Sequence, residues 1–446
     1  MLHRLPSLLA LHVLAILQAS GALSVPSPVQ AASSPAVSVS LGGMTYVNKG
    51  LVGFGRIPSN FTESTGDTLG GIGTFTGTLI VQPDRGFNVE TTVDYQARRH
   101  ELDFVLTPYS DSTPLSFEQA QKTFVLTYKN TVLYFERNNT KTSGLDPSTI
   151  RAAMPGMPIA STREPHLSVD AEGLVANVDG TDEYGPYIYL FSAEWVSPIL
   201  PEDKKGNINF TANADPKTGR AANQGFEGLT LDPATSTLYA ILQSATIQDG
   251  GEDSIYTRLF AYDISSPTYL SLAGNGKVEA TSEIHFLSEG TGTGMGGSGD
   301  NIKYKHIDLF SIANATDIHG TDFDSPSTPV APKGKLSKKI VPATYLSFVD
   351  YADTTQLARF GCTMVGDPDD NTLLDAKWES LALAPVGDSA PNDFFLFTAS
   401  DNDFLTTQGV SVGQPYNAGE DVDNQFLVFQ VMLPGAAGNV KTVLGL

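Results

Sequence analysis

Short runs of apolar residues, either alternating with polar residues or continuous, recur along the chain between Gly, Pro, Asp and Asn residues. Such runs, rich in β-branched and aromatic residues, are typical of antiparallel strands. Only residues 116–122 and 147–154 have a short helical pattern instead. Many strands without alternating helices predict an all-β protein: a sandwich, a barrel or a propeller. The clearest strands are expected at residues 77–81, 102–106, 123–136, 187–191, 238–242, 258–264, 305–312, 394–399 and 425–433.

A repeated tripeptide favours one of these folds. Glu-Gly-Leu or Glu-Ser-Leu begins at Glu172, Glu227 and Glu379, and a degenerate copy has Gly73 at the position of the glutamate. The first and last markers are 306 residues apart, which corresponds to six steps of about 51 residues. Propeller blades span roughly 40–50 residues. We therefore predict a single-domain β-propeller with seven blades, or six with longer loops, in which residues 45–57 and 425–433 could pair to close the ring.

The N-terminus has the pattern of a targeting segment. Residues 8–17 form an apolar run behind a weakly positive start, and small residues follow. This order is typical of a signal peptide, and the run is shorter than the ~18–20 apolar residues of a membrane anchor, which is the alternative. We predict a secreted protein with no stable membrane span after removal of the signal. The predicted segments are a signal peptide (1–22), a flexible Pro/Ala/Ser leader (23–42), the propeller domain (43–434) and a tail (435–446).

Export would give meaning to four Asn-x-Ser/Thr sequons, which are candidate glycosylation sites. They lie at Asn60, Asn138, Asn209 and Asn314. The chain has a single cysteine, which excludes an intrachain disulfide and a Cys-based metal site. Stability must then come from core burial, a bound metal or glycans.

The chain is strongly acidic, with 49 Asp and Glu against 27 Lys and Arg and a net charge of −22. This excess argues against a nucleic-acid partner, because that binding needs many Lys and Arg residues to displace phosphate counterions. Carboxylates from equivalent inner strands would also converge on a central channel, where unpaired anions repel one another and lose hydration. A hard divalent cation would relieve both effects, and oxygen ligands with few histidines suit Ca²⁺ or Mg²⁺.

We therefore predict a Ca²⁺ site in the channel. Its predicted ligands are Glu172, Glu227, Glu379, Asp182, Glu183, Asp401 and Asp403, with Asp84 adding an oxygen at the same end. Arg85 is placed to pair with a carboxylate or to hold an anionic substrate. The alternative is that each marker glutamate accepts hydrogen bonds from the backbone of the next blade and only joins the blades.

Six longer motifs follow one another along residues 43–434 and begin at Asp84, Asp170, Asp182, Asn223, Lys377 and Ser400. Together they resemble the phytase-like domain family, also labelled "esterase-like activity of phytase", in its secreted fungal form. The resemblance implies an extracellular β-propeller with a phosphoric-ester hydrolase role. The chain lacks the Asp-Ala-Ala/Thr-Asp/Glu-Asp-Pro run of calcium-dependent propeller phytases and the Arg-His-Gly-x-Arg-x-Pro motif of histidine acid phosphatases. Gln224 stands where related proteins often have Arg.

Two functions are compatible with these features. The first is a Ca²⁺-dependent hydrolase of small phosphorylated or other ester substrates, with a carboxylate as base and Arg85 stabilising the developing charge. Its candidate catalytic residues are Glu172, Glu227, Glu379, Asp84 and Arg85, and its candidate substrate-binding residues are Arg85, Tyr184 and Asn402. The second is a non-catalytic extracellular propeller with a structural channel metal that binds a glycan, a protein or a small ligand. A serine esterase is unsupported, because no Gly-x-Ser-x-Gly motif occurs.

Overall fold

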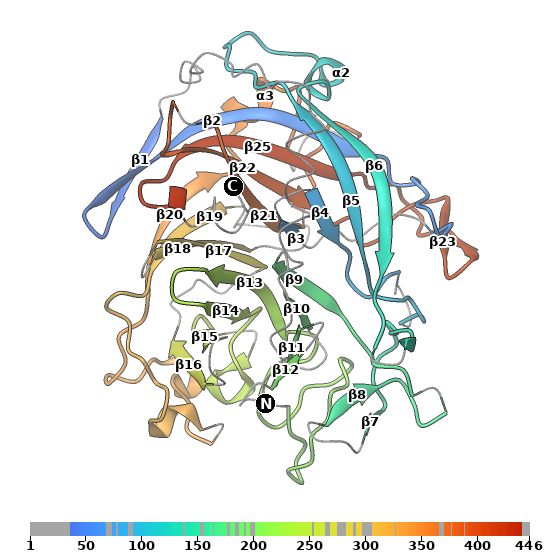
Figure 1. Ribbon diagram of the computed structural model, residues 1–446, viewed down its shortest axis with the longest axis vertical. Helices are drawn as coiled ribbons and strands as arrows, with labels where there is room; N and C mark the ends of the chain where they lie inside the picture. The colour runs from blue at the N-terminus through green and yellow to red at the C-terminus, as the bar shows by residue number, and fades with distance from the viewer. Residues whose placement is uncertain are drawn as a thin grey trace, which may run out of the picture.

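The computed structural model confirms an all-β chain (Figure 1). It describes residues 36–438 apart from residues 68–73, 77–78, 88–91, 137–138, 152–155, 164, 176–178, 183–186, 191–192, 197–200, 252–253, 264–267, 274–281, 289–290, 297–305, 326, 365–369, 376 and 388. Among these described residues, no helix has the length and apolar character needed to cross a membrane.

Five antiparallel sheets of four or five strands make up the described part of the fold. The first sheet contains β3 (Thr74–Thr76), β4 (Leu79–Gln82), β5 (Arg98–Leu106) and β6 (Phe124–Leu133), and the second contains β9 (Ala171–Val175), β10 (Asp179–Asp182), β11 (Tyr187–Leu190) and β12 (Ala193–Val196). The third contains β13 (Phe226–Asp232), β14 (Thr237–Leu242), β15 (Arg258–Asp263) and β16 (Thr268–Ala273). The fourth contains β17 (Glu283–Ser288), β18 (Thr291–Gly296), β19 (His306–Ser311) and β20 (Thr344–Asp350). The fifth has the order β1 (Val37–Leu41), β2 (Met44–Ile57), β25 (Asn424–Met432), β22 (Asp393–Ser400), β21 (Trp378–Pro385). Two hairpins are separate: β7 (Thr149–Arg151) with β8 (Met157–Ile159), and β23 (Gly409–Ser411) with β24 (Gln414–Tyr416).

The edge strands β3, β9, β13, β17 and β21 lie near the middle of the molecule, with their sheets extending outward (Figure 1). Each of these strands contacts the next one in chain order, and β21 contacts β3, so the contacts form a closed cycle. The described residues thus contribute five sheets to the cycle, and the predicted seven or six blades are not confirmed. The steps between sheets are unequal, because the connections from β6 to β9, from β12 to β13 and from β20 to β21 are much longer than the one from β16 to β17.

Glycine in the repeated tripeptide is explained by the close approach of neighbouring edge strands. A Cβ atom on Gly173 would lie 2.4 Å from the carbonyl oxygen of Glu227, and one on Gly228 would lie 2.6 Å from the backbone nitrogen of Ile284. Real Cβ atoms do not approach backbone this closely, so a larger residue would force the strands apart. The repeat therefore marks where one edge strand packs against the next.

The two ends of the described chain meet in the fifth sheet. Strand β2 pairs antiparallel with β25, in a register that runs from Val47 opposite Met432 to Ile57 opposite Asn424. The pairing predicted between these segments is thus confirmed. Strand β1 pairs with β2 and lies within the stretch predicted to be a flexible leader. Its alternating Val and Leu side chains account for this difference, since Leu41 is buried in the core.

The helical segments are short. The first predicted helix is confirmed as α2 (Phe117–Ala120), which begins with a capping box between Ser116 and Gln119. The second prediction is wrong where the structure describes it, because β7 occupies those positions and its β-branched residues pair with β8. Helix α3 (Thr354–Ala358) was not predicted, although the Asp353 side chain caps it. The 3₁₀ turns are η2 (Ile247–Asp249), η4 (Asp322–Asp324) and η5 (Pro332–Gly334).

The fifth sheet supplies apolar residues to both of its faces. On β25, Leu427 and Phe429 pack in a cluster that includes residues of the β17–β20 sheet. Phe426 and Val428 point the other way, into a cluster shared with the β3–β6 sheet. Since successive residues of a strand point to opposite faces, one continuous apolar run fills the space on both sides of the sheet.

Candidate functional site

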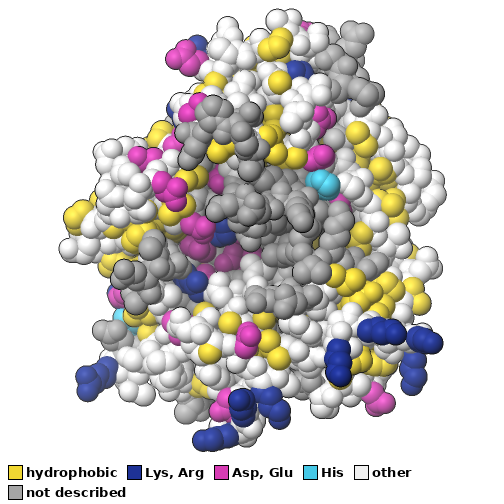
Figure 2. Space-filling model, turned by 180° about the vertical axis from the view of Figure 1, so that it is seen from behind, with side chains coloured by type: hydrophobic (Ala, Val, Ile, Leu, Met, Phe, Trp, Pro, Cys, Tyr) yellow, Lys and Arg dark blue, Asp and Glu magenta, His cyan; other side chains and the backbone are white. Residues whose placement is uncertain are grey.

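The predicted site residues lie where edge strands begin and second strands end. Glu379 is the second residue of β21, while Asp84 and Asp401 follow β4 and β22, the second strands of their sheets. In an antiparallel pair, the start of one strand and the end of its neighbour lie at the same end of the sheet. We refer to the resulting group as the mouth; it consists of Asp84, Arg85, Asp170, Lys377, Glu379, Asp401 and Asp403. Figure 2 shows acidic side chains gathered with Lys or Arg in a recess near the middle of one face.

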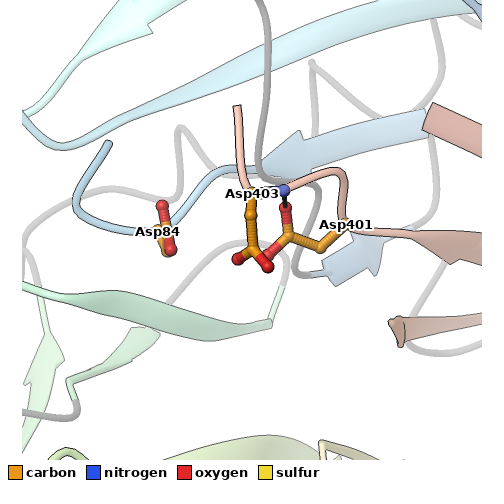
Figure 3. Close-up of side chains that lie close together, drawn as sticks. All are labelled: Asp84, Asp401 and Asp403. Atoms are coloured by element: carbon orange, nitrogen blue, oxygen red, sulfur yellow. Dashed lines mark hydrogen bonds between the residues drawn. The ribbon is translucent and has the colours of Figure 1, made fainter. Parts of the chain in front are cut away.

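Three aspartates of the mouth come close together (Figure 3). Asp84, Asp401 and Asp403 each offer a carboxylate oxygen within 4.8 Å of the other two. The backbone N–H of Asp403 donates to Asp401 Oδ1 at 2.8 Å, and that of Gly86 donates to Asp84 Oδ1 at 3.0 Å. Asp403 adopts a φ of +48°, which turns the chain back immediately after β22. Two tight turns from different sheets thus face each other with their carboxylates.

Lys377 lies among these acids. Its Nζ is 2.9 Å from Asp403 Oδ1 and 3.3 Å from Glu379 Oε2, and it also pairs with Asp401 Oδ2. The backbone N–H of Asp401 donates to the carbonyl oxygen of Lys377, which fixes the two residues side by side. The next residue, Trp378, is buried and donates from its indole to the carbonyl oxygen of Asp375. The lysine is therefore carried on a firmly packed segment.

The mouth shifts the pKa values of its ionisable groups. Burial raises the pKa of the Asp84 carboxyl to about 8, and the nearby charges of Asp401, Asp170 and Asp403 add to this effect against that of Lys377. Burial likewise raises the pKa of Glu379 well above its usual value. Burial alone would lower the pKa of Lys377, but the surrounding carboxylates raise it well above its usual value. Carboxylates thus outnumber the cations that neutralise them.

Arg85 is held against an acid. Its guanidinium lies 2.9 Å from Asp170 Oδ2 and donates to Asn223 Oδ1, and its backbone N–H donates to Asp170 Oδ1 at 3.1 Å. Asp170 and Asn223 precede β9 and β13, so this one side chain joins turns of three sheets. Pairing with a carboxylate is the first of the two roles predicted for Arg85.

The marker glutamates take different positions. All three are buried at the starts of their strands, and Glu379 shares Lys377 with two aspartates. Glu227 accepts a hydrogen bond from Gln243, and the Glu172 carbonyl oxygen accepts one from Gln82. These contacts connect Glu172 and Glu227 to neighbouring glutamines rather than to Lys377.

A fourth glutamate behaves as the packing alternative expects. Glu283 begins β17, and its Oε1 accepts from the backbone N–H groups of Leu229 at 3.1 Å and Ile284 at 2.8 Å. Leu229 belongs to the neighbouring edge strand β13. The Glu283 side chain therefore ties two adjacent sheets together.

The remaining predicted residues lie around the mouth or outside the described residues. Asp182 ends β10 and its side chain is not described, while Glu183 and Tyr184 lie outside the described residues. Asn402 is buried; its Nδ2 donates to Val422 O and its Oδ1 accepts from Phe404 N, so these bonds hold the turn after β22. Its contact with substrate stays a prediction. Of the sequon asparagines, Asn60, Asn209 and Asn314 are exposed, and Asn138 lies outside the described residues.

Sequence reasoning missed roles for three residues. Asp170 and Lys377 each stand two positions before a marker glutamate and directly before the edge strand that carries it. Glu283 lies 56 residues after Glu227, close to the 55 residues that separate Glu172 from Glu227. The sequence therefore contains two signals that could have identified these residues: the position two residues before a marker glutamate, and the spacing between marker glutamates.

Comparison with known proteins identifies the family of this chain. A family model described as "Phytase-like: Esterase-like activity of phytase" matches residues 72–335. The chain belongs to the phytase-like family. Asp84, Arg85 and Asp170 lie inside the span matched by the phytase-like model, while Lys377, Asp401 and the other C-terminal mouth residues follow it.

Two individual proteins are also similar to this phytase-like chain. An "Uncharacterized secreted protein" of Arthroderma benhamiae is 33% identical over 461 residues, covering 83% of this chain and 90% of the relative. A solved structure of a luciferin-regenerating enzyme aligns over 86% of this chain and 95% of its own, with 11% identity and a TM-score of 0.27. A likeness that low carries no argument about fold or function.

Proposed function

We propose that this phytase-like protein is a secreted, Ca²⁺-dependent hydrolase of phosphoric esters, built as a β-propeller on the cycle of edge strands. The observation that supports this most directly is the approach of Asp84, Asp401 and Asp403 to within 4.8 Å beside two cationic side chains. Carboxylates for a metal and cations for an anionic substrate are the groups that phosphoryl-ester hydrolysis needs in one place. Membership of the phytase-like family supports the same reaction class.

The donor set of the mouth suits calcium. In the part of the chain that the structure describes, three carboxylates and no histidine make up the group formed by Asp84, Asp401 and Asp403. Ca²⁺ takes six to eight oxygen ligands in flexible geometry. The raised pKa values of Asp84 and Glu379 also mean that the group gains from further positive charge. When bound, Ca²⁺ would supply charge that neutralises the substrate phosphate and polarises a water molecule.

The chain's own residues would orient the substrate and move the proton. Arg85, fixed in direction by Asp170 and Asn223, is the proposed contact for a phosphate oxygen. Glu379 is the proposed general base, because it is buried beside Asp401 and Lys377 and burial raises its pKa above the usual carboxyl range, which makes it a better proton acceptor. Glu172 and Glu227 complete the acidic lining that we propose for the channel.

The hydrolase proposal is tested with purified protein, phytate and p-nitrophenyl phosphate, in Ca²⁺ and in EGTA. Turnover should appear in Ca²⁺ and disappear in EGTA. Asp401→Asn should lower kcat/KM about a hundredfold, since it removes a charged group from the reaction site. Asp393→Asn is a matched control, because Asp393 pairs with Lys49 at the other end of β22 and should leave turnover unchanged. Absence of EGTA-sensitive turnover would contradict the proposal.

A second function is favoured by the packing of the marker repeat. Gly173, Gly228 and Glu283 all serve contacts between edge strands, so the repeat itself needs no catalytic explanation. In that case the protein would be a non-catalytic extracellular propeller with a structural metal, whose loops bind a glycan, a protein or a small ligand. The same assay separates the two functions: EGTA would then lower the melting temperature of a protein that turns over no ester.

Secretion is proposed from the apolar N-terminal run and from the relative named as secreted. Exposure of Asn60, Asn209 and Asn314 is compatible with glycans at these sequons. Expression in a eukaryotic host should yield protein in the medium with a new N-terminus near residue 22. Its mass should fall on treatment with an N-glycosidase, and retention of the full N-terminus inside the cell would contradict export.

A further inference from the structure

The mouth already contains a cation that belongs to the chain. Lys377 Nζ lies within ion-pair distance of Glu379, Asp401 and Asp403, and its side chain is 23% exposed. The Asp401 carboxylate is 1% exposed, so it depends on Lys377 for much of its neutralisation. A buried carboxylate that loses its cation is costly to the fold.

The ammonium and a divalent cation would use the same carboxylates. Asp401 and Asp403 pair with Lys377 and are also two of the three acids that approach within 4.8 Å. Oxygen ligands of Ca²⁺ lie roughly 2.3–2.6 Å from the ion. An ion at these carboxylates would therefore lie close to the ammonium, and the two positive charges would repel each other.

The Lys377 side chain can move away from a bound divalent cation. Lysine carries its charge on a flexible stem of four carbons and is strongly hydrated. The side chain is partly exposed, and one of its partners, Asp403, is 54% exposed. The ammonium can withdraw toward solvent without movement of β21, whose start is fixed by buried Trp378.

We propose that Lys377 is a tethered competitor of the metal: it neutralises Asp401 and Asp403 while the site holds no divalent cation, and it must leave them when Ca²⁺ binds. This inference rests on the metal part of the proposed function. It makes Lys377 a residue that sets the metal affinity of the mouth, and it predicts an exchange of one cation for another rather than filling of a vacant anionic cage.

The first test measures Ca²⁺ affinity by calorimetry on the full mature protein after EGTA treatment and dialysis. Lys377→Met should bind Ca²⁺ about tenfold more tightly than the wild type, since loss of one adjacent unit charge is worth at least one pKa unit of interaction. Lys49→Met is the matched control, because Lys49 pairs with Asp393 away from the mouth, and its affinity should equal that of the wild type. The double variant Lys377→Met, Asp401→Asn should lose this increase in Ca²⁺ affinity.

Thermal melting of the same proteins gives a second readout. In EGTA, Lys377→Met should melt at a lower temperature than the wild type, because Asp401 is left without its cation. Saturating Ca²⁺ should raise the melting temperature of the variant by more than that of the wild type. Equal or weaker Ca²⁺ binding by the variant would overturn the inference while leaving the metal site in place. Failure of every protein to bind Ca²⁺ would overturn the metal part of the proposed function as well.

A third test needs no variant and applies even if Lys377→Met does not fold. Lysine acetylation with an amine reagent, read by peptide mass spectrometry, should be slow at Lys377 in EGTA and several-fold faster in Ca²⁺, because the amine is released to solvent. Lys49 serves as the internal control and should react at the same rate in both conditions. An unchanged rate at Lys377 in protein that binds Ca²⁺ would overturn the exchange.

Discussion

Two groups of acids in this molecule have opposite electrostatic behaviour. Beside the β3–β6 sheet, Arg98 NH1 lies 2.8 Å from Glu63 Oε1 and 3.1 Å from Asp67 Oδ2, and all three side chains are buried. Burial alone would raise the pKa of Glu63, but hydrogen bonds from Thr65 and Thr131 and the charge of Arg98 lower it. In the mouth, by contrast, burial and neighbouring carboxylates raise the pKa values of Asp84 and Glu379.

The difference lies in the donors rather than in the acids. Glu63 accepts from the backbone and hydroxyl of Thr65, from the hydroxyl of Thr131 and from Arg98. Arg98 also packs 3.9 Å from the ring centre of Tyr95. A carboxylate with this many donors is a structural anchor, whereas acids that outnumber their donors are poised to take up a cation or a proton.

The largest expected effect is on the anchored group. Arg98→Met leaves Glu63 and Asp67 buried without their cation and should lower the free energy of unfolding by about 3–5 kcal/mol. Arg99→Met is the matched control, since Arg99 is partly exposed and lies 3.7 Å from Glu101, and it should cost less than about 1 kcal/mol. Urea unfolding measures both. We refer to Glu63, Asp67 and Arg98 as the Glu63 group. An equal loss of unfolding free energy in the two variants would mean that this group is not a structural anchor.

Two isosteric substitutions, one in each group of acids, should differ in their effect on the free energy of unfolding. Glu63→Gln exchanges a satisfied carboxylate for an amide and should destabilise the protein by about 1–3 kcal/mol. Glu379→Gln removes one negative charge from a crowded group, so in EGTA it should leave stability unchanged or increase it. Urea unfolding in EGTA at pH 7 compares the two variants. A large loss in Glu379→Gln would break the contrast between the groups.

The smallest expected effect is a pH dependence in EGTA. The pKa of Asp84 is raised to about 8 in the folded state, so between about pH 4 and 8 the folded protein binds a proton that the unfolded chain has released. The contribution of Asp84 to stability should therefore fall as the pH rises through this range. Asp84→Asn removes this pH-dependent contribution. From pH 5 to pH 8, the free energy of unfolding of the variant should therefore rise relative to that of the wild type by on the order of 1 kcal/mol. A constant difference in melting temperature would contradict the raised pKa.

The strand pattern and the marker repeat predicted much of the fold. They identified the class, the pairing of residues 45–57 with 425–433, and the starts of three edge strands. They missed the edge strand at Glu283, because Ile284 and His285 stand where the repeat has Gly and Leu. Long connections then made the average spacing misleading as a count of sheets.

The composition of the mouth was less predictable. Asp84, Glu379, Asp401 and Asp403 were all expected, because carboxylates near strand ends of a repeated unit meet at one end of the fold. The position of Lys377 depends on the path of a long side chain and on its pairing with a residue 24 positions later, which no local pattern encodes. The number of donors around an acid, which separates the mouth from the Glu63 group, likewise appears only after folding.

The pairing of β2 with β25 also constrains how a cell can make this protein. The paired residues Ile57 and Asn424 are 367 positions apart, so β2 leaves the ribosome long before its partner exists. Contacts this distant in sequence slow folding and prolong exposure of the apolar strand. A growing or truncated chain that stops before residue 424 presents the open edge of β2 to chaperones and proteases. The fifth sheet can therefore form only in a molecule whose synthesis has continued through β25.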